Sequence, residues 1–324
     1  MRRVISLTTV LGALLGVLTA ILVLYLMPPT DDFHPENPYW NGLSKLTTLI
    51  QIKPIKNIEE LHKYDPQEVA LMIVGPSKHF NMPEIKQIKT FLLEGGLMIL
   101  ADDFGTANDV LKGLNLTLRL SGLPLADSFQ GEKISYMPRA KIHLNDLDEI
   151  ILNYATIIEV TEKSSKDLYR LAFSTPLSFL DSDLDKFKDP EERRGPFTVA
   201  IKISYGNGTL ILISDSSLFI NSMINMGDNL RFLRHLLSDR LVLLDTSHWE
   251  ISTITMIKRQ LSKSLEVLQT PEVKYLLLVI FIISLLRLRK TSLEKSNNRV
   301  ERLLERHPTW NKKILEILEE DIHE

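Results

Sequence analysis

The chain of 324 residues contains no cysteine. This absence excludes a cysteine nucleophile, a thiolate metal site and disulfide bonds. A chain of this length does not need disulfides, because it can bury a sizeable hydrophobic core. Any chemistry must therefore rest on oxygen and nitrogen side chains.

A strong charge of either sign is also absent, since the formal net charge is −3 and charged residues make up 24% of the chain. We therefore expect no nucleic-acid partner. The sequence also lacks the Gly-x-Ser-x-Gly elbow, the His-Glu-x-x-His zinc motif, the Walker pattern and the Gly-x-Gly-x-x-Gly loop. We expect no cofactor.

Two apolar runs lie near the two ends of the chain. The first extends from Val4 to Met27 and is preceded by Arg2 and Arg3. A membrane-spanning helix needs about 20 mostly apolar residues, which this run supplies. A cleaved signal peptide is the alternative, but the run ends in Tyr-Leu-Met-Pro-Pro without a small-residue cleavage site. We expect an uncleaved anchor.

The second run covers residues 265–286, and its strictly apolar part is Tyr275 to Leu286. A dozen apolar residues alone would suit a buried helix docked on a soluble domain, which remains the alternative. Arg287, Arg289 and Lys290 follow at once and favour a membrane helix that stops at the cytoplasmic face.

Positive residues outside both runs predict a two-pass protein of the cell membrane with both termini in the cytoplasm. The lipid bilayer is then its first partner. The expected parts are a cytoplasmic N-terminus (1–3), a transmembrane helix (4–27), an extracytoplasmic α/β domain (28–248), a stalk (249–264), a second transmembrane helix (265–286) and a cytoplasmic amphipathic tail (287–324).

Strand and helix patterns alternate between the runs and predict an open, mostly parallel sheet flanked by helices. The clearest expected strands are Thr48–Ile55, Val69–Val74, Leu97–Ala101 and Arg240–Leu244. The expected helices begin near Asn57, Pro83, Ala107 and Asp228, the last with Asp228 as N-cap.

Two further strand patterns, Phe197–Tyr205 and Thr209–Ser214, flank a short Gly-Asn-Gly turn and predict a β-hairpin. Short strands are expected at Ile150–Tyr154 and Leu168–Phe173. The charged segment Asp181–Arg194 predicts an exposed loop.

Small or acidic residues follow four of the predicted strands. In open α/β sheets, ligands bind outside the carboxyl ends of the strands, so these residues predict one ligand-binding rim. The alternative is that each of them only caps a helix or forms a turn. The candidates are Gly75, Ser77, Asp102, Asp103, Asp215, Asp245 and His248.

Several segments resemble one family of archaeal and bacterial membrane proteins, domain of unknown function 4350. They are Leu71-Met-Ile-Val-Gly-Pro-Ser, Phe91 to Thr106 with its Ala-Asp-Asp-Phe-Gly-Thr end, Ser214 to Asn221, and Gly227-Asp228-Asn229. Asp228 and Asn229 thereby join the ligand-binding candidates.

The resemblance implies an outer domain with the flavodoxin-like fold of class I glutamine amidotransferases. It also implies genes nearby for a cytoplasmic ATPase of the MoxR type and for other membrane proteins. Amidotransferases of this fold use a cysteine, which is absent here, so we do not expect that activity.

The tail carries two amphipathic stripes, separated by His307-Pro308. Because a lone amphipathic helix is marginal in water, the stripes predict docking on a partner or on the membrane surface. A hairpin that closes on itself is the alternative. Balanced charge disfavours a simple polybasic lipid anchor.

Two functions follow from these patterns. We expect a non-catalytic binding or assembly subunit that links the outer domain to cytoplasmic machinery such as a MoxR-type ATPase. The alternative is a metal-dependent or serine hydrolase of cell-envelope polymers, which would require five side chains to converge: Asp102, Asp103, Asp215, Asp245 and His248.

Overall fold

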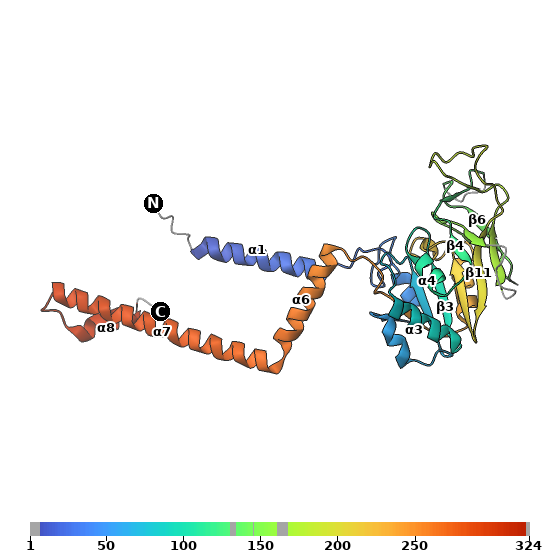
Figure 1. Cartoon of the computed structure of the whole chain (residues 1–324). Helices are drawn as coiled ribbons and strands as arrows, with labels where there is room; N and C mark the ends of the chain where they lie inside the picture. The colour runs from blue at the N-terminus through green and yellow to red at the C-terminus, as the bar shows by residue number, and fades with distance from the viewer. Residues whose placement is uncertain (1–6, 130–133, 145, 161–167, 322–324) are drawn as a thin grey trace. The chain divides into compact units, whose positions relative to one another are not determined.

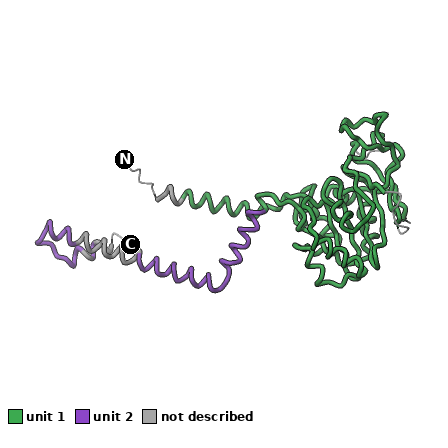
Figure 2. The backbone as a smooth tube through the Cα atoms, viewed as in Figure 1, with its two compact units in different colours: residues 1–255 green, residues 256–324 purple. Residues whose placement is uncertain are grey.

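The computed structural model describes residues 7–129, 134–144, 146–160 and 168–321, and the chain divides into two compact units, residues 1–255 and 256–324 (Figure 2). The expected cytoplasmic N-terminus, residues 1–3, and the first residues of the first apolar run lie outside the described part.

The first unit is built on a nine-stranded sheet with the order β1-β13-β2-β3-β12-β11-β9-β6-β7 (Figure 1). The strands of one half are β1 (Ile52–Ile55), β13 (Leu241–Asp245), β2 (Val69–Val74), β3 (Leu97–Ala101) and β12 (Gly208–Ile213). The strands of the other half are β11 (Thr198–Tyr205), β9 (Leu168–Ser174), β6 (Arg139–Ile142) and β7 (Glu149–Ile151).

The first five strands are parallel to one another, whereas every pairing from β12 to β7 is antiparallel. The prediction of an α/β sheet flanked by helices is confirmed, but the sheet is mixed rather than mostly parallel. The β11–β12 hairpin, which the Gly-Asn-Gly turn predicts, reverses the direction of the sheet, and the following strands continue antiparallel.

Helices cover both faces of the parallel half of the sheet. The central strands β2 and β3 are therefore buried along their whole length. In β2, Leu71 and Ile73 pack with η1 (Ile58–Lys63), α3 (Met82–Leu93) and α4 (Ala107–Gly113). Met72 and Val74 of the same strand pack on the opposite face with α2 (Ser44–Leu49), η2 (Ser217–Phe219) and α5 (Asn229–Leu237). Side chains that alternate between two apolar layers explain why the strand sequences are apolar throughout.

Local signals set several helix starts. Asn81 and Glu84 form a capping box at the start of α3, with Pro83 in its first turn as expected. Asn57 accepts a hydrogen bond from Glu59 N at the start of η1. The prediction of a strand from Thr48 is wrong at its first residues, because α2 extends to Leu49 and β1 begins at Ile52.

The segment between α4 and β11 adds two small two-stranded sheets beside the main sheet. One pairs β4 (Leu118–Leu120) with β8 (Ile158–Val160), and the other pairs β5 (Leu125–Ala126) with β10 (Phe179–Leu180). None of these four short strands was expected from the sequence, because a strand of two or three residues carries too little periodicity to be recognised.

The remaining helices are α1 (Leu7–Leu26), α6 (Thr253–Gln269), α7 (Pro271–Arg306) and α8 (Lys312–Asp321). Among the described residues, no single helix has both the length and the hydropathy of a membrane span. Within α1, Gly12–Leu26 counts as a shorter apolar helix. Helix α6 and the part of α7 up to Arg287 meet both criteria only together, as a pair of helices bent by 74°.

Candidate functional site

The carboxyl ends of four neighbouring parallel strands, β13, β2, β3 and β12, form the rim that the sequence predicts. The loop after each strand carries the expected polar residues. Two of these loops meet around His248, and the other two meet around Asp103. The geometry of each group decides what chemistry the rim can support.

His248 is buried between two carboxylates. Its Nδ1 lies 2.6 Å from Asp245 Oδ2, and its Nε2 lies 3.4 Å from Glu84 Oε2 on α3. The ring of Phe80 stacks on the imidazole with centroids 3.8 Å apart. Burial alone would lower the pKa of His248, but the hydrogen bond and charge of Asp245, together with Glu84, raise it overall. The arrangement favours an imidazolium held between two anions.

Ser77 and the backbone of His248 fasten the loop after β2 to the loop after β13. Ser77 N donates to the His248 carbonyl at 2.8 Å, and Ser77 Oγ donates to the same oxygen at 3.2 Å. Ser77 Oγ also accepts from Glu250 N. The hydroxyl therefore joins the two loops and does not contact an imidazole nitrogen.

Ser247 is the serine whose hydroxyl does contact the imidazole, but it lies 3.1 Å from Nδ1, the nitrogen that also faces Asp245. A serine hydrolase needs its serine on the nitrogen opposite the aspartate. In the described residues Nε2 of His248 instead faces Glu84.

Gly75 is closed off by an aromatic ring from the segment after α1. Its φ of +53° lies in the left-handed region, and a Cβ atom here would come within 2.4 Å of the Phe33 ring. Trp249, whose Nε1 donates to Val74 O at 2.6 Å, contacts the same Phe33 ring. Gly75 therefore serves a tight turn under an aromatic cover.

Asp102 uses both carboxylate oxygens to hold the loop between β3 and α4. Its Oδ1 accepts from the backbone N–H groups of Asp103 and Gly105, and its Oδ2 accepts from that of Ala107. Burial of the side chain raises its pKa to about 6, although the backbone hydrogen bonds act in the opposite direction. Asp102 is thus an internal cap of this loop.

Asp103 links this loop to the one after β12. Ser216 Oγ donates to Asp103 Oδ2 at 3.1 Å, and Asp215 accepts from the backbone N–H groups of Asn153 and Ser217. Burial raises the pKa of Asp103 and that of Asp215, and the negative charge of Asp103 raises the pKa of Asp215 further. The Asp102, Asp103 and Asp215 carboxyl groups therefore gain protons more readily than ordinary aspartates.

Asp228 and Asn229 begin α5 and hold it to β7. Asp228 Oδ2 accepts from Asp148 N, and its Oδ1 accepts from Arg231, so the N-cap hydrogen bond expected of Asp228 is not formed. The buried Asn229 amide accepts from Ile151 N and donates to Ile151 O, as a strand neighbour would. These two candidates contact the β7 edge of the sheet rather than the carboxylates of the rim.

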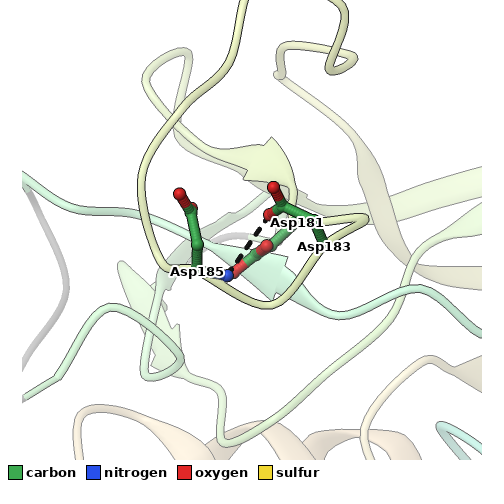
Figure 3. A group of neighbouring side chains, drawn as sticks. All are labelled: Asp181, Asp183 and Asp185. Carbon is green, nitrogen blue, oxygen red and sulfur yellow. Dashed lines mark hydrogen bonds between the residues drawn. The ribbon is translucent and has the colours of Figure 1, made fainter.

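A different acidic group has the spacing of metal ligands. Among the described residues, Asp181, Asp183 and Asp185 offer carboxylate oxygens within 4.8 Å of one another, and no three of the predicted rim ligands do so (Figure 3). Asp181 is buried, although the sequence predicted an exposed loop here. Its carboxylate accepts from Tyr136 Oη at 2.6 Å and from the backbone N–H groups of Leu184 and Lys186. The alternating Asp-Ser-Asp-Leu-Asp pattern was the available signal for this turn.

Comparisons with solved structures return distant likenesses, among them the following three. The mmIFT52 N-terminal domain is 13% identical, with a TM-score of 0.43 over 60% of this chain and 87% of that one. A β-galactosidase from Bacillus circulans sp. alkalophilus is 13% identical, with a TM-score of 0.31 over 52% of this chain and 22% of that one. A cytoplasmic protein, STM1381 from Salmonella typhimurium LT2, is 11% identical, with a TM-score of 0.32 over 58% and 74%.

No curated protein matches the chain. One family model matches residues 35–237, which is more than half of the sequence and contains β2, β3, β12 and most of the strand-end candidates. The chain therefore belongs to the family described as Domain of unknown function (DUF4350).

Proposed function

We propose that this protein is a non-catalytic binding or assembly subunit, anchored in the cell membrane, that links an extracytoplasmic α/β domain to cytoplasmic machinery. The observation that carries the proposal is that the polar side chains of the rim are occupied by their own loops. We also propose that the outer domain is a variant of the class I glutamine-amidotransferase fold, in which the antiparallel half of the sheet is an addition.

A catalytic base or nucleophile needs a lone pair that can reach a substrate. Both carboxylate oxygens of Asp102 accept hydrogen bonds from backbone N–H groups. The two carboxylate oxygens of Asp245 are bonded to Ser247 and to His248. These contacts favour a structural role, and they disfavour the alternative of a serine or metal-dependent hydrolase.

Exposed apolar helices support the membrane anchor. The large apolar side chains of α1 between Leu14 and Leu26, except the half-buried Leu24, and those of α7 between Tyr275 and Leu286 are solvent-exposed. Contiguous apolar surface of this extent needs a lipid or protein cover. Insertion of both segments, with Arg287 on the cytoplasmic side, satisfies this need and the positive-inside rule together.

The tail supplies a second uncovered surface. Helix α8 contacts α7, and His307 stacks on Trp310 at the turn between them. A hairpin that closed fully on itself would bury the apolar stripe of α8, but Ile314, Ile317 and Leu318 remain exposed. The stripe therefore supports docking on a partner, and the resemblance noted above makes a MoxR-type ATPase the first candidate.

Co-purification with a MoxR-type ATPase of the native host tests the assembly role. The full-length chain is expected to retain the ATPase, whereas Ile314→Glu with Leu318→Glu should abolish retention because it charges the stripe. Lys313→Glu on the same helix is the matched control and should retain the ATPase. Equal recovery with all three proteins would refute docking through α8.

Reporter fusions test the topology separately. A reporter fused after Glu324 should read cytoplasmic, and one inserted near Asp189 should read extracytoplasmic. The opposite pattern would overturn the membrane placement, whatever the result with the ATPase.

A further inference from the structure

A cavity of about 290 Å³ lies at the end of the sheet opposite to the rim. Its walls include the first residues of β3 and β12, the middle of β9 and β11, and the C-terminal turn of α5. The four strands belong to the nine-stranded sheet and α5 packs on one of its faces, all within the first unit, so the cavity is part of the folded domain.

The cavity is positively charged. Lys202 on β11, His235 on α5 and Arg240 just before β13 line it, together with the polar side chains of Asn207, Thr209 and Ser238. No aspartate or glutamate is among the described residues that line it. Three basic groups without a compensating acid produce a field that attracts anions.

Arg240 lacks the partners that a partly buried arginine normally has. Its Nη1 is buried and forms no hydrogen bond, and its guanidinium is in no ion pair within the described residues. Leaving a buried charged donor unpaired is costly. Guanidinium has a fork of donors that matches carboxylate and phosphate oxygens, so the missing partner is best supplied by an oxyanion.

A simpler explanation is that His235 and Arg240 only complement the negative end of the α5 dipole. In that case Arg240 would be expected to donate to the last carbonyls of the helix. The bonds seen there come from backbone instead: Ser238 N donates to Arg234 O, and Arg240 N donates to Leu237 O. The dipole therefore does not account for the unpaired guanidinium.

The glycines that line the cavity allow the chain segments to approach closely, but they do not supply free hydrogen-bond donors. Gly96 N donates to Phe91 O, and Thr209 N donates to Gly96 O, so these backbone groups are already used. A Cβ atom at Gly208 would come within 2.3 Å of Leu92 O, which shows how closely the chain segments approach here. Recognition of an anion would thus rest on side chains.

From the cavity, its charge and the unpaired guanidinium, we infer that Arg240, Lys202 and His235 form a binding site for a small oxyanion of the phosphate class, free or as part of a small phosphorylated molecule. The site contains no residue of the strand-end rim or of α8, so it does not depend on the proposed assembly role.

Titration of the full-length protein with inorganic phosphate, in a neutral detergent and at constant ionic strength set with chloride, tests the site. Isothermal calorimetry should detect saturable binding, and phosphate should raise the Tm of the α/β domain. Arg240→Met should weaken binding by about tenfold or more, since a charge-assisted hydrogen bond is lost. Lys202→Met, at an exposed position, should weaken it as well.

Arg119→Met is the matched control, because Arg119 is exposed on β4 and lies outside the cavity. It should bind phosphate like the unmodified protein. Absence of saturable binding to the unmodified protein would overturn the inference, as would unchanged affinity in Lys202→Met and Arg240→Met. If Arg240→Met does not fold, the comparison of Lys202→Met with Arg119→Met still decides the outcome. A parallel titration with glucose 6-phosphate distinguishes the free ion from a phosphorylated molecule as the preferred ligand.

Discussion

Replacing His248 by alanine should destabilise the α/β domain strongly and in a pH-dependent way. The imidazole is buried, with Asp245 2.6 Å from one nitrogen and Glu84 3.4 Å from the other. Removing one member of a buried charged group leaves the remaining charges unpaired, which typically costs about 3–5 kcal/mol. We expect a loss of this size in the free energy of unfolding at pH 6.

The sign of the pH dependence follows from the raised pKa of His248. A basic group whose pKa is higher in the folded state contributes its full stabilisation below the pKa of the unfolded state, about 6.5. The contribution is lost as the pH rises through the folded-state pKa. The stability difference between the unmodified protein and His248→Ala should therefore be larger at pH 6 than at pH 9.

Urea unfolding followed by tryptophan fluorescence provides the assay. Trp249 is a suitable probe because it is buried next to His248 and donates to Val74 O. His79→Ala is the matched control: His79 also lies 2.7 Å from an aspartate, Asp109, but its side chain is exposed. The control should have a much smaller effect, because exposed ion pairs contribute little. An equal effect of both variants, or a difference that grows toward pH 9, would refute the reasoning.

Three further substitutions test the other contacts of the predicted site residues. Asp102→Asn should reduce the free energy of unfolding by ~1–3 kcal/mol at pH 4, where the side chain is uncharged in both folded proteins, because an amide N–H₂ would face the Ala107 N–H; chemical denaturation measures this, and equal stability at pH 4 would contradict it. Because the pKa of Asp102 is raised from 3.8 to about 6, the unmodified protein should lose roughly 2 kcal/mol between pH 4 and pH 7 through this group, and the asparagine variant should lack that loss. Gly75→Ala should lower the Tm, at a cost of ~1–3 kcal/mol, because of its positive φ and the Phe33 ring; a Phe33→Ala background that relieved none of the loss would argue against the contact. Asn229→Ala should lower the free energy of unfolding in urea by ~2–4 kcal/mol, since it leaves the buried N–H and C=O groups of Ile151 in β7 without a hydrogen-bond partner. A loss below 1 kcal/mol would show that water replaces the amide.

The parallel half of the sheet could be predicted because its signals are local and redundant. Val69–Val74 and Leu97–Ala101 are apolar at every position, and the Asn81–Glu84 capping box fixes the start of the helix between them. The antiparallel half could be predicted only in part. In β6, buried and exposed positions alternate over four residues, which is too short a pattern to set a strand direction.

Partners that are distant in sequence account for most of what the sequence did not reveal about the site. Asp245 and His248 are three residues apart, and their pairing could be suspected from the sequence. Glu84 and Phe80 complete the group from the segment that follows the neighbouring strand β2, more than 160 residues earlier in the chain. The cavity around Arg240 has no sequence motif at all, because Lys202 and His235 reach it from different elements.

The strand-end residues show why a shared edge of a sheet does not by itself make a ligand site. The sheet topology brings Asp102, Asp215 and Asp245 to that edge, because they lie at or just after the carboxyl ends of parallel strands in one sheet. Their hydrogen bonds, however, go mainly to donors two to five residues later: Gly105 and Ala107 for Asp102, Ser217 for Asp215, and Ser247 for Asp245. Chains that leave a buried strand must satisfy the backbone N–H groups of the next turn, and a short carboxylate at or just after the end of the strand does so efficiently. A strand-end aspartate becomes a candidate for ligand binding only when its loop leaves an oxygen free. Asp103 comes nearest to this condition, because its Oδ2 is held by the side chain of Ser216 rather than by backbone, and a hydroxyl can be displaced.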